Sequence, residues 1–533
     1  MTQTSASHKA PLAAPVETYD TTLRDGTQRE GISLSCDDKI RIARRLDAFG
    51  IPIIEGGWPG SNPKDEEFFL RARDEEWEHA KIAAFGSTCR VGSAAEDDAN
   101  IKALLDAHTP ICTLVGKTSP FHVKEVLRTT HDENLRIIEE SVAFLVDQGR
   151  RVIYDAEHFF DGCREDQSYA LETLAAAARG GADTLVLCDT NGGSLPWEIE
   201  DLTRIVRASV EGPIGIHCHD DGGCAVANTI VAVRAGARHV QGTINGYGER
   251  CGNANLCVVL PQLEINVGRK CMEPENLDQL FDLSRFVAEV ANLAQDEHMA
   301  FVGRSAFAHK GGIHTSAVRR AVDSYQHIDP ALVGNQTRIV VSELAGRASL
   351  QAKAEELGIT TVDGSQYVEV LNRIKELEAR GFSFEAAGAS VAMMLERHTQ
   401  DYTPPFELID YTTTVEHREK RGMVTEATVK VRVGEEVFHT AAEGNGPVNA
   451  LDKALRKALL PVFPQIEDFH LVDYKVRILD GGRATGATTR VLVDTQNASS
   501  RWSTVGASTN IIEASWLALA DSLEYGLVVD RRN

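Results

Sequence analysis

Two histidines separated by a single residue, His217 and His219, lie near the end of the apolar run PIGIHCHD at 213–220. Such a run is typical of a β-strand, in which alternate side chains share a face, so both imidazoles should point the same way. Two imidazoles on one face suit a divalent metal ion better than a hydrophobic core. Asp25 follows another predicted strand, in TTLRDGTQ, and we expect it to supply a carboxylate ligand.

The amide oxygen of Asn253 completes a mixed nitrogen and oxygen ligand set around the predicted ion. This set leaves two positions open on a six-coordinate metal. It suits Mg²⁺, Mn²⁺ or Zn²⁺, and the lack of thiolate ligands argues against a closed structural zinc site. The keto and carboxylate oxygens of a 2-oxo acid could fill the open pair, and the metal would then polarise the carbonyl as a Lewis acid.

The elements that must position these residues follow from the alternation of short β-branched runs with longer amphipathic segments. Eight strand-and-helix units predict a parallel (β/α)₈ TIM barrel, since an open doubly wound sheet would need only five or six strands. Glycines at 50, 149 and 181 are expected to end helices. The predicted strands are VETYDTT (16–22), IPIIEGG (51–57), KIAAFGS (81–87), ICTLVGK (111–117), RVIYDAE (151–157), DTLVLCD (183–189), PIGIHCHD (213–220) and HVQGTING (239–246).

The loops that follow the strands of such a barrel all open on one face, where the active site lies. Polar residues at the predicted strand ends are therefore candidate site residues. Among them we expect Tyr154 to contact the substrate. The full set is Arg24, Asp25, Glu55, Tyr154, Glu157, Asp189, Thr190, Asn191, His217 and His219, with Asn253 in the loop after the eighth strand.

The chain divides into four predicted parts: a disordered tail at 1–15, the barrel at 16–285, a helical linker region at 286–403 and a C-terminal domain at 404–533. In the last part, the runs ATVKVRV (427–433) and TRVLVDT (489–495) are each followed by a second strand-like run, a glycine-centred loop and an apolar helix. This pattern predicts a duplicated βββα unit in a compact α+β module. Regulation or assembly is its expected role, and a purely structural role is the alternative.

Composition narrows the functional class. The 533 residues carry a formal net charge of −23, which argues against a nucleic-acid partner. No apolar run approaches the roughly 18 residues of a membrane-spanning helix, and the first fifteen residues lack the apolar core of a signal peptide. Ten cysteines without CxxC pairs predict reduced thiols in a cytoplasmic protein, with Cys218 and Cys251 as small packing residues.

Several motifs resemble those of the acyl-CoA-condensing, metal-dependent barrel family, which contains 2-isopropylmalate, homocitrate and citramalate synthases and has hydroxymethylglutaryl-CoA lyase as a relative. The similarity runs from about residue 16 to the C-terminus. The family motifs are TTLRDGTQ, IHCHDDGG, NGYGERCGNAN and HKGGIH; the stretches GGWPGSNPKDEEFF, KTSPFHVKEVLRTT, VIYDAEHFFDG and LVLCDTNGGSLPWEI resemble the (R)-citramalate synthase branch.

The resemblance implies roles for the matching residues. Asp25, His217 and His219 would be metal ligands, with Asn253 in or beside the shell. Arg24 would bind the 2-oxo acid and stabilise developing oxygen charge, although an ion pair with a neighbouring carboxylate, Asp25 or Glu55, is an alternative or additional role. Thr190 would hydrogen-bond the substrate carboxylate.

The general base implied by the family is Glu157 or His314, the histidine of HKGGIH. His314 lies outside the barrel in sequence and would reach the active site by folding over or by exchange within a homodimer. One family branch has a tyrosine shortly after this motif that assists the histidine. Here Thr337 occupies the nearest equivalent position, and Tyr325 could substitute.

The implied reaction condenses acetyl-CoA with a 2-oxo acid and then hydrolyses the thioester. Pyruvate is the predicted substrate, giving citramalate for isoleucine biosynthesis; no further cation stands at a strand end to bind the second carboxylate of 2-oxoglutarate. The alternatives are 2-isopropylmalate synthase, which acts on 2-oxoisovalerate, and a catalytically silent amino-acid sensor. The C-terminal domain is expected to bind a branched-chain amino acid, isoleucine if the product is citramalate.

Overall fold

The computed structural model describes residues 14–272, 276–321, 324–342, 345–359, 364–419 and 422–529. Most of the predicted tail lies outside these ranges. The chain forms two compact units. The first comprises the chain up to Phe307 together with Pro330–Gln336, and the second comprises Ala308–Asp329 together with the chain from Thr337. Each unit is described by itself below.

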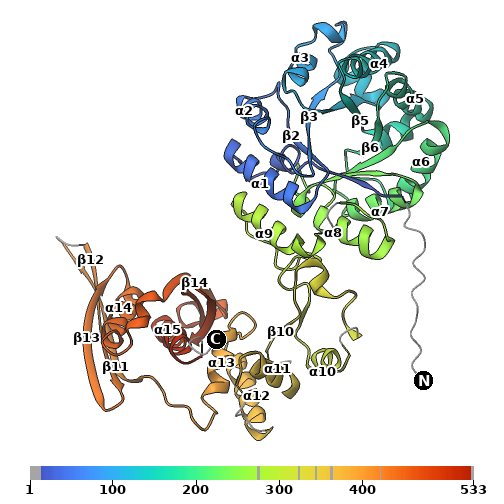
Figure 1. Cartoon of the computed structure of the whole chain (residues 1–533). Coiled ribbons are helices and arrows are strands. Elements are labelled where there is room, and N and C mark those ends of the chain that lie inside the picture. Colours follow the sequence, from blue (N-terminus) through green and yellow to red (C-terminus); the bar gives the residue numbers. More distant parts are fainter. Residues whose placement is uncertain are drawn as a thin grey trace, which may run out of the picture. The chain divides into compact units, whose positions relative to one another are not determined.

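The first unit contains a closed barrel of eight strands in chain order (Figure 1). Neighbouring strands are parallel, and β1 closes the ring by pairing with β8. All eight predicted strands are confirmed. The strands are β1 (Glu17–Asp20), β2 (Ile53–Gly57), β3 (Lys81–Ser87), β4 (Ile111–Lys117), β5 (Arg151–Glu157), β6 (Thr184–Asp189), β7 (Ile214–Cys218) and β8 (His239–Gly242).

Helices follow the strands and surround the barrel (Figure 1). They begin and end where local sequence directs: α1 starts at Ser35, whose side chain and Asp38 form a capping box, and stops at Gly50 with φ 101°. The helices are α1 (Cys36–Phe49), α2 (Pro63–Ala72), α3 (Ala99–Asp106), α4 (His131–Asp147), α5 (Phe159–Arg179), α6 (Pro196–Ser209), α7 (Ala225–Ala235) and α8 (Leu256–Pro261), with α9 (Leu280–Val290) completing the unit.

Side chains fill the inside of the barrel, so the site lies at its mouth and not in an open pore. One buried layer consists of Tyr19, Ile53, Ala83, Ile111, Ile153, Val186 and Cys188. Because side chains alternate along each strand, this layer also shows which other residues of the strands face the interior.

The second unit begins with a short parallel pair of strands and continues through four helices. These helices lie within the helical linker region predicted at 286–403, but residues 291–311 of that region form turns and strand β9. The elements are β9 (Ala308–His309), α10 (Gly312–Arg320), β10 (Arg338–Ile339), α11 (Arg347–Glu356), α12 (Gly364–Ala379) and α13 (Gly388–Glu396).

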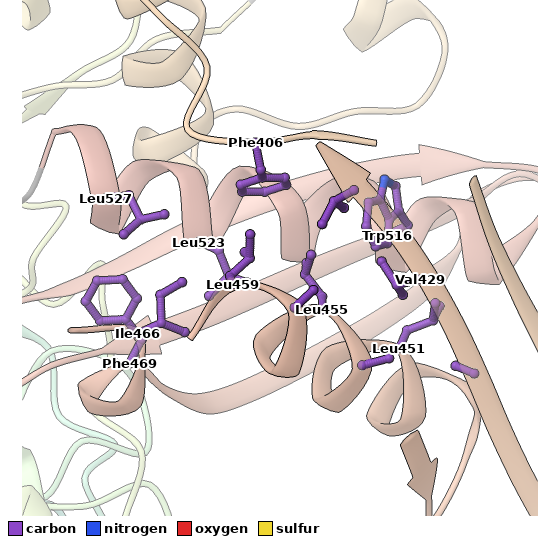
Figure 2. Close-up of a cluster of buried hydrophobic side chains, with 14 of the residues drawn as sticks. Phe406, Val429, Leu451, Leu455, Leu459, Ile466, Phe469, Trp516, Leu523 and Leu527 are labelled. Atoms are coloured by element: carbon purple, nitrogen blue, oxygen red, sulfur yellow. The ribbon is translucent and has the colours of Figure 1, made fainter. Parts of the chain in front are cut away.

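The C-terminal part repeats one pattern twice, as predicted: three antiparallel strands followed by a helix. Both helices contribute to one apolar core, in which Leu451, Leu455 and Leu459 of the first helix meet Leu523 and Leu527 of the second (Figure 2). The repeats are β11 (Glu407–Arg418), β12 (Gly422–Val433), β13 (Glu436–Gly444) and α14 (Pro447–Leu459), then β14 (His470–Ile478), β15 (Thr489–Gln496), β16 (Arg501–Ser508) and α15 (Ile511–Val528).

None of the helices in the described ranges has both the length and the apolar character needed to cross a bilayer.

Candidate metal centre

Three buried side chains converge at the mouth of the barrel. Asp25 follows β1, His217 lies in β7 and His219 directly after it. Oδ2 of Asp25 is 3.6 Å from Nε2 of His217 and 3.8 Å from Nε2 of His219. One ligand atom from each residue lies within 4.8 Å of the others, which is the spacing of a group that could hold a metal ion.

Unsatisfied polar atoms mark the same place. Asn253 forms a bridge to His219 through the backbone, and its Nδ2 donates a hydrogen bond to the carbonyl of Tyr247 (3.2 Å). Within the described part of the chain, Oδ1 of Asp25, Oδ1 of Asn253 and Nδ1 of His219 are buried without a hydrogen-bond partner. Buried polar atoms are normally paired, and unpaired carboxylate and amide oxygens beside two imidazoles fit a divalent cation.

The electrostatics hold these groups in metal-binding form. Burial by itself would raise the pKa of Asp25, but the Arg24 charge and then the two imidazoles lower it to about 2. Burial lowers the pKa of His217, and burial followed by the influence of His217 lowers the pKa of His219 to about 4. At neutral pH the site therefore presents a carboxylate and neutral imidazoles, as metal binding requires.

Arg24 is clamped beside this cluster. Its Nε donates to Oε2 of Glu55 (2.7 Å), its Nη1 donates to Oδ2 of Asp25 (3.2 Å), and its guanidinium lies 3.8 Å from the centre of the Phe85 ring. Arg24 therefore pairs with both carboxylates. Glu55 is fully buried and also accepts hydrogen bonds from the hydroxyls of Tyr19 and Thr21. These contacts fix the guanidinium plane at the mouth.

Glu157 and Thr190 lie at the same end of the barrel. Glu157 forms an ion pair with Lys117, its partner in register on β4. Thr190 directly follows β6, and its Oγ1 accepts a hydrogen bond from the backbone N–H of His158 (2.9 Å). Sequence reasoning missed Lys117, although it also ends a predicted strand. The expectation that no further cation stands at a strand end is therefore wrong, but Lys117 is already paired with Glu157.

Tyr154 is not brought to the cluster. Its neighbours in β5 face inward, because Ile153 belongs to the interior layer and Asp155 hydrogen-bonds Gln241 inside the barrel. Alternation therefore points the Tyr154 side chain outward, toward the surrounding helices, where it is fully buried. The Tyr154 hydroxyl therefore faces away from the metal centre, against the prediction that Tyr154 contacts the substrate.

His314 belongs to the second unit, where it lies exposed in α10. Its ring stacks on Tyr325 with 4.2 Å between ring centres. Thr337 instead accepts a hydrogen bond from Nε2 of Gln326 (2.5 Å). Of the two candidate helper residues, Tyr325 contacts His314. Participation of His314 in the barrel site stays a prediction.

The cysteines are all free thiols. Cys218 is buried as predicted, and burial raises its pKa well above the usual range, so it is a poor nucleophile. The prediction that Cys251 is a packing residue is wrong, because Cys251 is exposed on the loop after β8.

An eight-stranded barrel with a carboxylate, two histidines and an arginine at its mouth defines a class of metal-binding barrel protein. Comparison with known families agrees. Residues 15–287 match the HMGL-like family, residues 301–381 match the homocitrate synthase post-HMGL domain-like family, and residues 385–527 match the LeuA allosteric (dimerisation) domain.

Curated relatives cover almost the whole chain. The (R)-citramalate synthase of Geobacter sulfurreducens is 51% identical over 515 residues, which are 96% of this chain and 97% of the relative. That of Synechocystis sp. is 53% identical over 524 residues, 96% and 95% of the two chains. A probable 2-isopropylmalate synthase of Methanopyrus kandleri is 33% identical, over 94% of this chain and 96% of its own. The chain belongs to the HMGL-like family and, within it, to the (R)-citramalate synthases.

Proposed function

We propose that the protein condenses acetyl-CoA with pyruvate and water to give citramalate and CoA. The observation that carries this proposal is the cluster of Asp25, His217, His219 and Asn253 with its unpaired oxygens, beside the clamped Arg24. Identity above 50% to two (R)-citramalate synthases supports the choice of reaction.

The pyruvate site is built from the mouth of the barrel. A divalent ion, Mg²⁺, Mn²⁺ or Zn²⁺, bound by the four residues of the cluster would polarise the keto group of pyruvate. Arg24 would donate to the substrate oxygens and stabilise negative charge as it develops on the keto oxygen. Thr190 would hydrogen-bond the substrate carboxylate.

The condensation needs a base that removes a proton from the methyl group of acetyl-CoA. Glu157 and His314 are the proposed candidates. The carbon nucleophile then forms a bond to the keto carbon of pyruvate, whose oxygen takes up a proton. Water finally cleaves the thioester, releasing CoA and citramalate. The ion pair with Lys117 occupies an oxygen of Glu157. Proton removal therefore requires Glu157 to leave that pair or His314 to act instead.

The experiment that tests the substrate compares CoA release with pyruvate and with 2-oxoisovalerate under identical conditions. Faster turnover with pyruvate is expected. Faster turnover with 2-oxoisovalerate would make the protein a 2-isopropylmalate synthase, the name of more distant relatives. No CoA release with either acid, combined with tight binding of an amino acid, would favour a sensor.

The C-terminal domain supports two further proposals: a homodimer and inhibition by isoleucine. Both rest on the match to the LeuA allosteric (dimerisation) domain, which begins at residue 385, ahead of the predicted boundary at 404. Helix α13 packs against α15 as well as α11 and α12, so removing the C-terminal domain would expose apolar surface on the remaining helices.

The test of regulation therefore uses the full-length enzyme and measures its activity during titration with isoleucine, leucine and valine. Inhibition by none of them would exclude the regulatory proposal.

We also propose a cytoplasmic location, which the ten free thiols support because such compartments keep cysteines reduced.

A further inference from the structure

Buried polar side chains cross the inside of the barrel next to the metal centre. Gln241 of β8 is the partner in register of His217 on β7, and its Oε1 lies 2.8 Å from Nδ1 of that histidine. Nε2 of Gln241 donates a hydrogen bond to Oδ1 of Asp155 on β5 (2.9 Å). Strands β5 and β8 are not neighbours in the barrel, so these two side chains meet across its interior.

The polar chain continues toward the opposite end of the barrel. Nε2 of His239 is 3.5 Å from Nε2 of Gln241, and Nδ1 of His239 is 3.0 Å from Oε2 of Glu17. Arg151 donates to both oxygens of Glu17 at 2.7 Å. Glu17 and Arg151 begin β1 and β5, so they lie at the end of the strands remote from the site.

The chemistry of each group decides which atoms in this row of polar side chains donate hydrogen bonds and which accept them. Although burial opposes it, hydrogen bonding to His239 and Arg151 lowers the pKa of Glu17 to about 2, so Glu17 is a carboxylate that only accepts hydrogen bonds. Nδ1 of His239 then donates to Glu17, and the amide nitrogen of Gln241 lies beside Nε2 of His239. The amide group of Gln241 thus faces His239 and Asp155, and its carbonyl oxygen faces His217.

That orientation decides which nitrogen of His217 bears the proton. Since Oε1 of Gln241 can only accept, Nδ1 of His217 donates to it, and the Nε2 lone pair points toward Asp25. A reversed amide would offer N–H to Nδ1, shift the proton to Nε2 and block the ligand atom. Oδ1 of Asp155, which accepts the amide N–H at 2.9 Å, opposes that reversal because it would then face the amide oxygen.

We propose that Gln241, oriented by Asp155, is a positioning residue that holds His217 in the tautomer whose Nε2 binds a divalent cation. The inference rests on the metal centre of the proposed function. It adds two residues, from β8 and β5, that touch neither substrate nor metal.

The test measures the affinity of metal-stripped, full-length protein for Mn²⁺ by titration calorimetry. In Gln241→Met the side chain keeps its length but offers Nδ1 no acceptor, so we expect a loss of about 10- to 100-fold. In Gln241→Glu an oxygen acceptor for Nδ1 of His217 remains, so binding should stay within about threefold of the unchanged protein. Ile153→Val, in the adjacent interior layer, is the matched control for altered packing.

The outcomes separate this inference from the proposed function. If the unchanged protein binds Mn²⁺ and Gln241→Met binds it equally well, the tautomer role is overturned and the metal centre stands. If the unchanged protein does not bind Mn²⁺, the metal centre itself fails. A purely structural role would lower the melting temperature of metal-free Gln241→Met and Ile153→Val alike and change the affinity of neither.

Should Gln241→Met fail to fold, Asp155→Leu asks the same question, since it removes the group that orients the amide. Weaker Mn²⁺ binding than in Ile153→Val is expected, and unchanged binding would overturn the proposal.

Discussion

The side chains at the mouth of the barrel and in the core of the C-terminal module are both buried, but the first are polar and the second are apolar. At the mouth, Asp25, His217 and Asn253 are removed from solvent and two of them keep unpaired oxygens. In the C-terminal module, leucines from α14 and α15 pack in one apolar cluster with Trp516 and Phe469 (Figure 2).

This difference indicates that the polar residues at the mouth serve ligand binding, whereas the apolar core serves the stability of the fold. Burying polar groups without partners costs free energy, and a protein retains them where a ligand supplies the missing partner. The hydrocarbon core needs no ligand, and its burial stabilises the fold directly. Substitutions in the two regions should therefore change different measurements: ligand binding and turnover at the mouth, unfolding in the C-terminal module.

The largest expected effect is that of His217→Ala. Loss of one imidazole should weaken metal binding and lower kcat/KM by on the order of 10³-fold, since a bound cation contributes several kcal/mol to charge stabilisation. Metal titration and CoA release measure both changes. The exposed His298→Ala is the control, and full turnover by metal-stripped His217→Ala would contradict the proposed chemistry.

Arg24→Lys sharpens the comparison within the mouth. Lysine keeps the charge but cannot reach Glu55 and Asp25 with a planar pair of donors. We expect kcat/KM to fall by about 10²- to 10³-fold while Mn²⁺ affinity changes little. Arg44→Lys, at an exposed ion pair with Glu75, should leave turnover unchanged. An equal loss of metal affinity in Arg24→Lys would place Arg24 in ligand orientation and not in charge stabilisation.

Leu455→Ala should lower the stability of the fold and leave metal binding unchanged. Leu455 is fully buried, so the substitution should cost about 2–5 kcal/mol of unfolding free energy. Chemical unfolding followed by tryptophan fluorescence measures this loss, because Trp502 and Trp516 both lie in this core. The control is Leu517→Ala, whose side chain is 38% exposed and should cost much less. Metal affinity should be unchanged in both variants, and a change in Leu455→Ala would show that the two regions are coupled.

The smallest effect tests the polar barrel end that lies away from the site. Because the folded pKa of Glu17 is depressed from 4.5 to about 2, its contribution is complete above pH 4.5 and is lost as pH falls toward 2. The difference in unfolding free energy between the unchanged protein and Glu17→Gln should be at most about 3 kcal/mol near pH 6. It should shrink through that window, and a difference independent of pH would contradict the role of the ion pair with Arg151.

Much of the barrel could be predicted from the sequence because the patterns that define its strands and helices are local. Runs such as ICTLVGK and RVIYDAE are apolar over the length of one strand, and α1 carries its own cap at Ser35 and its own stop at Gly50. The metal ligands were legible for the same reason, since the alternation in His217-Cys218-His219 sets both imidazoles on one face.

Sequence order by itself thus determined the eight strand-and-helix units, the duplicated C-terminal pattern and the residue types of the metal centre. Tertiary structure alone decided which strand-end side chains meet: it turned Tyr154 outward, paired Glu157 with Lys117 and brought Gln241 from β8 to Asp155 on β5. The physical reason is that alternation and capping act between residues close in the chain. Contacts across a barrel depend on its closure and on the register of strands far apart in sequence.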